Sequence, residues 1–276
     1  MKNMLLRYMT ALIAVPILII VIQFCPSIVF DTIAAVAIIL ALYEWCHLST
    51  PTLSPIYAIS LAIIALTGMY LFSQVGDGSI IYVAFMTCIA GASAFQIFNR
   101  GKKMSDAAQS IVFLVTGIVC IVWGGGAVIM LRETPLHGQF DNREMIYFLL
   151  ATVWVGDAGA LHVGKTFGKT PLAPIISPKK TVEGLIGAIC FGVLAGYAAD
   201  LILDIGLLHW QRIFLPVALV LMAHAGDLTI SIFKRAASVK DSGSLLPGHG
   251  GFLDRLDNLF YSAPFLYCFA RIFWHA

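Results

Sequence analysis

The chain has 276 residues, of which 59% are hydrophobic and only 12% are charged. A soluble domain carries about twice that share of charged residues, so the composition excludes an ordinary soluble globular protein. Six cysteines lie scattered in apolar runs without paired spacing, which excludes a secreted disulfide scaffold. The net charge of +2 indicates little by itself. We therefore predict an all-α, polytopic integral membrane protein.

Nine apolar stretches follow one another along the chain, most of them near the length of about 20 residues that a helix needs to cross a bilayer. The first follows Lys2 and Arg7 as a signal peptide would, but its apolar run is too long and no cleavage site follows, so we interpret it as a retained helix. The stretches are residues 9–29, 31–48, 56–72, 79–98, 108–131, 145–163, 184–204, 212–232 and 256–274.

The basic residues are distributed unevenly between the two ends of these helices. If the N-terminus and every second loop lie on one side, thirteen of the 17 basic residues fall there and four on the other side. The positive-inside rule then predicts a cytoplasmic N-terminus. We expect residues 1–143 to form about five N-terminal spans. Residues 144–276 are expected to form a catalytic region of about four spans with two long cytoplasmic loops, 164–183 and 233–255.

Both loops are rich in Gly, Ser, Lys and Pro, and each follows a helix that carries an acid. Asp157 lies near the cytoplasmic end of the sixth stretch and Asp227 near that of the eighth. An acid inside a span is costly, so each requires a cation, a metal or water, unless it reaches the membrane edge. Glu44, near the cytoplasmic end of the second stretch, is a further acid that could approach the same site.

The first loop begins with a match to a phosphate-binding motif. Gly159–Thr166 fits the pattern GxxxxGK[ST] letter for letter. That motif works only between a buried strand and a following helix, whereas here an apolar span precedes it and Pro171 and Pro174 follow. We predict no P-loop, although Lys165 and Lys169 could still contact phosphate as point charges.

The segment Ile176–Gly184 carries a stronger signal for phosphate. Ser177 can cap a helix and Pro178 suits a first helical turn, so the seventh helix is predicted to begin here. Free N–H groups at a helix N-terminus, together with Lys179 and Lys180, would bind phosphate. A basic cap at the membrane edge is the alternative.

The end of the eighth stretch has one polar face. At 100° per residue its polar residues fall within a sector of about 80°. A solvated face would explain the charges but not the acid one turn deeper, so we predict an amphipathic helix that continues past the membrane surface. The residues of this face are Asp227, Ser231, Lys234, Arg235 and Ser238, with Asp241 near one edge.

The segment that follows, 240–251, cannot be a regular helix, and three of its glycines surround His249. Such glycines allow backbone to approach a ligand closely. Asp254 and Asp257 would then share one face at the start of the ninth helix. The helix dipole alone favours acids there, but acids that repel one another favour a divalent cation.

At this point the sequence resembles a known family. Ser231 to Asp257 matches, at every fixed position over 27 residues, the signature of CDP-diacylglycerol synthase (phosphatidate cytidylyltransferase). Ile176–Gly184 is similar to the family's second conserved stretch, and 154–168 to the approach to it. Where the family often has Asp-Thr-Gly-Ala-Tyr, this chain has Asp157-Ala-Gly-Ala-Leu161 and lacks both hydroxyls.

The resemblance implies a transferase of phospholipid biosynthesis. CTP and phosphatidate would give CDP-diacylglycerol and pyrophosphate, with Mg²⁺ required and a second cation such as K⁺ beside it. The resemblance also implies a membrane-bound homodimer, and the topology predicted from the basic residues puts its active site on the cytoplasmic face of the cell's inner membrane. Its expected partners are CTP, phosphatidate and membrane lipids, and no nucleic acid.

On this basis each candidate residue receives a role. Asp227, Asp254 and Asp257 are predicted to bind metal. Asp227, Lys240, Asp241, His249 and Arg255 are predicted to be catalytic, the last four by orienting or holding the triphosphate and leaving group. Substrate binding is assigned to Ser177, Lys179 and Lys180 for phosphate, Lys234 and Arg235 for the lipid phosphate, and Asp157, Ser231, Gly250 and Gly251 around them.

The reaction would be an in-line attack of the lipid phosphate on the α-phosphorus of CTP. Within the enzyme class, a CDP-archaeol synthase or a CTP-dependent lipid kinase could share these residues. From another class, an ion-coupled transporter could also carry acids in its spans. The acids lie near one face and no inverted repeat is apparent, which argues against transport.

Overall fold

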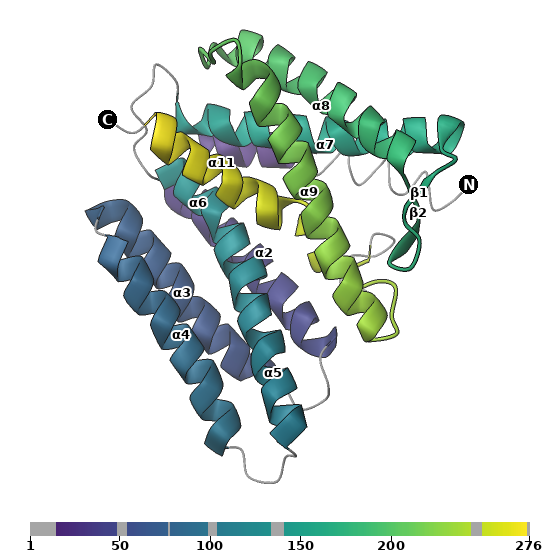
Figure 1. The fold of residues 1–276 in the computed structure, drawn as a ribbon. Helices are drawn as coiled ribbons and strands as arrows, with labels where there is room; N and C mark the ends of the chain where they lie inside the picture. The colour runs from purple at the N-terminus through teal and green to yellow at the C-terminus, as the bar shows by residue number, and fades with distance from the viewer. Residues whose placement is uncertain are drawn as a thin grey trace. The chain divides into compact units, whose positions relative to one another are not determined.

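The structure, a computed structural model, describes residues 15–48, 54–76, 78–98, 104–133, 141–243 and 250–274. Within these ranges the chain is almost entirely helical, which confirms the all-α prediction (Figure 1). The elements are α2 (Ser27–Leu48), α3 (Pro55–Val75), α4 (Gly78–Phe98), α5 (Met104–Gly117), η1 (Ile118–Trp123), α6 (Gly124–Glu133), α7 (Asn142–Phe167), β1 (Pro171–Ala173), β2 (Ser177–Thr181), α8 (Val182–Leu203), α9 (Gln211–Ala236), α10 (Leu253–Leu256) and α11 (Leu259–Phe273).

Six of the helices in the described ranges are long and apolar enough to cross a membrane. They are Ser27–Leu48, Pro55–Val75, Ala107–Glu133, Asn142–Phe167, Val182–Leu203 and Gln211–Ala236, and the shorter apolar helices are Val15–Phe24, Gly78–Ala94 and Leu259–Phe273. A multi-pass membrane protein is thereby confirmed. The count of nine spans and the orientation stay predictions.

The described residues fall into two compact units. One comprises Met1–Glu133 and Ala237–Leu256, and the other Thr134–Ala236 and Asp257–Ala276. The chain therefore leaves the second unit after α9, contributes twenty residues to the first, and returns just before α11. The boundary expected at residue 143 stays a prediction.

The first unit is organised around α2, which packs against α3 and α6. Trp45 of α2 is fully buried, and its ring nitrogen donates a hydrogen bond to the backbone carbonyl of Phe113, 3.0 Å away. Gly117 makes room for this indole, because a Cβ there would lie 2.5 Å from the ring nitrogen. The bulky side chain is thus accommodated by a glycine on a neighbouring helix.

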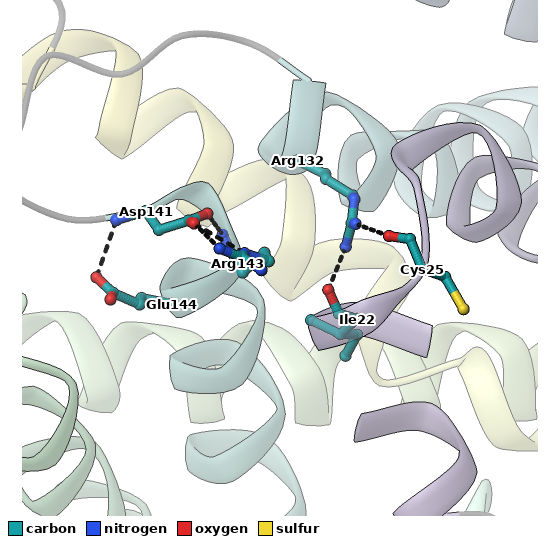
Figure 2. A network of polar contacts seen from close by, with 6 residues as sticks. All are labelled: Ile22, Cys25, Arg132, Asp141, Arg143 and Glu144. Carbon is teal, nitrogen blue, oxygen red and sulfur yellow. Dashed lines mark hydrogen bonds and ion pairs between the residues drawn. The ribbon is translucent and has the colours of Figure 1, made fainter. Parts of the chain in front are cut away.

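Arg132, at the end of α6, contacts the end of the helix Val15–Phe24 in the same unit (Figure 2). Its guanidinium donates to the carbonyl oxygens of Ile22 at 2.9 Å and Cys25 at 3.1 Å, and lies 4.8 Å from the centre of the Phe30 ring. These carbonyls belong to the end of the helix Val15–Phe24 and the residue after it. A cation here satisfies carbonyl groups that the helix end leaves open.

The second unit contains α7, α8, α9 and α11 with the β1–β2 hairpin. α7 and α8 lie side by side along their length (Figure 1). Glycines allow the close approach: a Cβ at Gly159 would lie 2.6 Å from Phe191, and one at Gly187 would lie 2.6 Å from Val163. Small residues at such contacts are typical of packing between membrane helices.

A capping box fixes the start of α7 (Figure 2). The carboxylate of Asp141 accepts a hydrogen bond from the backbone N–H of Arg143 at 2.9 Å, and Glu144 accepts one from the N–H of Asp141 at 3.0 Å. Arg143 also forms an ion pair with Asp141. These bonds satisfy N–H groups that the first helical turn leaves open.

The prediction that a helix begins at Ser177 is wrong. Ser177–Thr181 forms β2, which pairs antiparallel with β1 in the register Pro171 with Thr181 and Ala173 with Ser177. α8 begins at Val182, and its cap is Thr181, whose hydroxyl accepts a hydrogen bond from the N–H of Gly184 at 3.1 Å. Ser177, Lys179 and Lys180 therefore lie on a hairpin and not on a helix terminus.

The predicted extension of the eighth span is right as far as Ala236, where α9 ends. Ser238 lies beyond it with φ of 59°, and Asp241 lies in the irregular segment that follows. The predicted helical face is thus reduced to Asp227, Ser231, Lys234 and Arg235.

Candidate active site

The predicted site residues divide between the two units, and the largest charged group lies in the second. Lys180 of β2 and Asp227 of α9 form an ion pair with 2.5 Å between Nζ and Oδ2. The hydroxyl of Ser231, one turn further along α9, donates to Oδ1 of Asp227 at 3.2 Å. Both ionic side chains remain partly exposed, Lys180 at 23% and Asp227 at 33%.

The hairpin determines which lysine meets Asp227. Successive side chains of a strand point to opposite faces. Lys180 is half-buried against α9, whereas Lys179 is exposed. The base of the hairpin is held by Glu183, whose carboxylate accepts hydrogen bonds from the backbone N–H groups of Lys169 at 3.1 Å and Thr170 at 3.2 Å.

Asp157 of α7 joins the same group. Its carboxylate accepts a hydrogen bond from the side-chain amide of Asn258, with 2.6 Å between Nδ2 and Oδ2. Asp157 also interacts electrostatically with His224, Asp227 and Lys180. The two acids that the sequence predicts inside spans are therefore neighbours in the structure.

Asp257 is the third carboxylate of this group. It is 6% exposed, its Oδ1 accepts the backbone N–H of Asn258 at 2.9 Å, and it interacts with Asp227. Gly226, next to Asp227 in α9, permits this proximity, because a Cβ there would overlap the backbone carbonyl oxygen of Asp257. Asp227 thus supplies a carboxylate, and Gly226 beside it leaves the space that the backbone of Asp257 occupies.

Lys234 and Arg235 lie in the last turn of α9, on the helical face that carries Asp227. Lys234 is only 7% exposed and interacts with Asp227. Arg235 is exposed, and its Nε donates to the carbonyl oxygen of Ile176 at 3.1 Å, in the turn of the hairpin. Arg235 therefore ties α9 to the hairpin that carries Lys180.

Two residues of this group are not among the predicted site residues. His224 is 8% exposed, one turn before Asp227, and its Nδ1 lies 3.0 Å from the carbonyl oxygen of Val220. Asn258 contacts Asp157, while its own Oδ1 is buried and has no hydrogen-bond partner within the described residues. The position of Asn258 directly after the Asp254–Asp257 pair was the available signal in the sequence.

The remaining signature residues belong to the first unit. Oδ2 of Asp254 accepts the backbone N–H groups of Ser242 at 2.9 Å and Gly251 at 3.4 Å. Gly250 has φ of +83°, a conformation that favours glycine. Lys240, Asp241 and Arg255 are exposed, and His249 lies outside the described residues.

Glu44 of α2 accepts hydrogen bonds from signature residues that precede Asp254. Its carboxylate accepts hydrogen bonds from the hydroxyl of Ser242 at 2.8 Å and from the N–H groups of Phe252 at 3.1 Å and Leu253 at 3.0 Å. A Cβ at Gly251 would overlap this carboxylate. The close backbone approach at Gly251 is therefore an approach to Glu44.

The match to the P-loop pattern has no phosphate-binding geometry. Gly159–Thr166 lies entirely within α7, which runs to Phe167. A P-loop needs a strand before it and open backbone N–H groups, whereas these N–H groups lie within a continuous helix. The prediction that this motif is not a P-loop is confirmed.

The carboxylates fit a magnesium ion only in part. Within the described residues, no group of three or more His, Cys, Asp and Glu side chains is arranged to hold a metal. Mg²⁺, however, is usually bound through one or two carboxylates, with waters and substrate phosphates completing its shell. Asp227 and Asp257 supply two carboxylates that already interact, so their chemistry fits this ion.

A family model described as the cytidylyltransferase family matches residues 5–273 of the chain. The chain belongs to the cytidylyltransferase family. This confirms the family that the signature predicts.

Curated relatives carry the same family's name. A phosphatidate cytidylyltransferase of Rickettsia bellii is 40% identical over 168 residues, which cover 58% of this chain and 69% of the relative. One from Bacillus subtilis is 39% identical over 128 residues, 46% of this chain and 48% of the relative. One from Staphylococcus saprophyticus is 36% identical over 149 residues, 54% and 56%. The chain spans about half the length of most of these relatives.

Proposed function

We propose that this member of the cytidylyltransferase family transfers the cytidylyl group of CTP to phosphatidate. The products are CDP-diacylglycerol and pyrophosphate, and the role is in phospholipid biosynthesis. The names of the relatives support the substrates. The observation that carries the proposal is the cluster of Lys180 with Asp227, Asp157 and Asp257 at the base of the hairpin.

The nucleophile is a phosphate oxygen of phosphatidate. A phosphomonoester has a second pKa near about 6, so it is largely dianionic at neutral pH and needs no strong general base. The barrier comes from bringing two polyanions together. Catalysis therefore rests on charge neutralisation and on alignment of the lipid phosphate with the α-phosphorus.

Asp227 and Asp257 would hold Mg²⁺, and Asp254 is a further ligand predicted from the sequence. The bound ion would neutralise charge on the phosphates of CTP and on the leaving pyrophosphate. Ser231 orients the Asp227 carboxylate by its hydrogen bond at 3.2 Å, and Asn258 orients Asp157. A second cation such as K⁺ is part of the proposal through the family resemblance.

The basic side chains divide between the two substrates. Lys180 supplies positive charge to phosphate at the carboxylate cluster, and the phosphate roles of Ser177 and Lys179, on the other face of the same strand, rest on the sequence. Lys234 and Arg235, at the end of α9, suit the lipid phosphate, because the acyl chains stay in the bilayer. The triphosphate and pyrophosphate are assigned to Lys240, His249 and Arg255, with Asp241 as an orienting partner and Gly250 and Gly251 giving the loop its shape.

The site faces the cytoplasm in this proposal, where CTP is available. The excess of basic residues on the side of the N-terminus supports that orientation in the cell's inner membrane. The homodimer is proposed from the family resemblance alone.

Incubation of the purified protein with phosphatidate, Mg²⁺ and CTP labelled in the cytosine ring tests the function. We expect label in the lipid fraction as CDP-diacylglycerol, with one pyrophosphate released per lipid. A CTP-dependent kinase would leave the cytosine label in solution, and a CDP-archaeol synthase would prefer an archaeal ether lipid. Absence of labelled lipid with any of these acceptors would refute the proposal.

A further inference from the structure

Glu44 is a carboxylate buried in the first unit, at 3% exposure on the apolar helix α2. A buried carboxylate is costly unless it is hydrogen-bonded. Three donors meet it: the hydroxyl of Ser242 and the backbone N–H groups of Phe252 and Leu253, at distances between 2.8 and 3.1 Å. The donors lie 198 to 209 residues further along the chain, in Ser242 and in the residues at the start of α10.

Gly243 and Gly251 leave space for this carboxylate. A Cβ at Gly243 would lie 2.8 Å from Oε1 of Glu44, and one at Gly251 would overlap Oε2. Ser242 links Glu44 of α2 to Asp254, because its hydroxyl donates to Glu44 and its N–H donates to Asp254. Two glycines and a serine of the signature thus serve the contact with Glu44.

We propose that Glu44 is a positioning residue that holds Ser242 and the segment 251–254, together called the loop here, in the conformation required to bind CTP. It acts through the loop and does not touch substrate. Its hydrogen bonds fix Phe252 and Leu253, and the next two residues are Asp254 and Arg255, which carry the proposed ligand and the proposed triphosphate contact. This inference rests on the proposed function for its effect on CTP, but not for its effect on the loop.

A buried acid could instead matter only for the stability of α2. Asp31 provides the matched control, since it lies on the same helix at 8% exposure. Neither of its carboxylate oxygens has a hydrogen-bond partner within the described residues. Asp31→Asn therefore changes a buried acid of α2 without touching the loop.

The first test is hydrogen exchange of the full chain in lipid nanodiscs, measured by mass spectrometry. Glu44→Gln keeps the shape but replaces one acceptor oxygen by an NH₂ group, which cannot accept from a backbone N–H. Because these two N–H groups donate to different oxygens of Glu44, we expect exchange of at least one of the amides at 252 and 253 to accelerate about tenfold or more, as for a lost bond to a charged acceptor. Asp31→Asn should leave them at the wild-type rate. Wild-type exchange in Glu44→Gln would overturn the proposal.

The second test separates the two substrates. Because the lipid-phosphate residues lie on α9 and not on the loop, Glu44→Gln should raise the KM for CTP about tenfold and leave that for phosphatidate within about twofold. A protein that is merely destabilised would lose kcat with both KM values unchanged, and that result would also overturn the proposal.

If Glu44→Gln does not fold, Ser242→Ala can be measured in both experiments in its place. It removes only the hydroxyl donor, so we expect the same two changes at smaller size, and no change in either would contradict the proposal. If the wild-type protein makes no CDP-diacylglycerol, the proposed function fails, whereas the exchange experiment still decides whether Glu44 holds the loop.

Discussion

Lys180 and Asp227 have proposed roles that compete with their own ion pair. Lys180 is proposed to bind phosphate and Asp227 to bind a cation, yet their charged atoms lie 2.5 Å apart. Each proposed ligand must therefore draw one member of the pair away from the other. Removing one partner of such a pair leaves the other charge uncompensated.

Asp227→Asn should leave the protein inserted in the membrane but remove its metal-dependent turnover. Loss of the charge weakens cation binding and releases Lys180, so we expect kcat/KM to fall by about 100-fold or more. Labelled product at matched membrane abundance is the measurement. Asp204→Asn is the control, because Asp204 has φ of 53° at the end of α8, a conformation that Asn tolerates. Near-normal activity of Asp227→Asn would refute its assignment.

Lys180→Met should strengthen the binding of a metal cation and weaken the binding of substrate. Without the ammonium group beside it, Asp227 is more available to a cation, so Mn²⁺ alone should bind about threefold to tenfold more tightly. The KM for CTP or for phosphatidate should rise, because a phosphate loses its counter-charge. Electron paramagnetic resonance measures the first and steady-state kinetics the second. Lys179→Met should not change Mn²⁺ affinity, since Lys179 is exposed on the other face of β2. Unchanged values for Lys180→Met would contradict both roles.

The turn between α10 and α11 packs against Gly226 of α9. Even a methyl group at Gly226 would overlap the backbone carbonyl oxygen of Asp257. Helix packing and the spacing of the carboxylates therefore depend on the same residue. An added side chain must displace the turn that carries Asp257 and Asn258.

Gly226→Ala should destabilise the second unit by about 1–3 kcal/mol, the usual cost of overpacking a tight contact. Thermal unfolding in detergent measures this cost. Activity should also fall at temperatures where the variant remains folded, because Asp257 moves away from Asp227. Gly78→Ala is the control, since no atom lies within 4 Å of a Cβ there. Equal melting temperatures for wild type and Gly226→Ala would show that the turn yields without cost.

At the scale of elements, local patterns predicted which segments are helical but not every helix end. Ser177 followed by a proline has the chemistry of a cap, and Thr181 has it too, four residues later. Pairing of β2 with β1 decides between them, and such pairing depends on residues outside the local pattern. Periodicity likewise brought Asp227, Ser231 and Lys234 onto one face, but the pattern could not show that α9 ends at Ala236.

The contacts between distant elements were predictable only in part. Two costly acids in spans, Asp157 and Asp227, indicated a shared site, and they are neighbours in the structure. Asn258 was missed although it directly follows the Asp254–Asp257 pair, because a single amide has no pattern that identifies its partner in another helix. Nothing in the sequence around Glu44 shows that its carboxylate accepts hydrogen bonds from the signature loop.

The orientation of the whole molecule is predicted from its basic residues and can be tested directly. In a cysteine-free background, Ser238→Cys should react with a membrane-impermeant maleimide in inverted vesicles but not in intact spheroplasts. His209→Cys, in the connection between α8 and α9, should show the reverse, because thirteen of the 17 basic residues lie on the side of Ser238. The same labelling pattern for both residues would contradict the predicted topology.

The pairing of Glu44 with Ser242, 198 positions away, also has a consequence for biosynthesis. At the usual speed of translation the loop leaves the ribosome about 10 to 40 s after α2. During that interval the nascent helix has an acid with none of the donors that it meets in the finished protein. The early intermediate must therefore keep this side chain in contact with water or with other polar groups until Ser242, Phe252 and Leu253 have been synthesised.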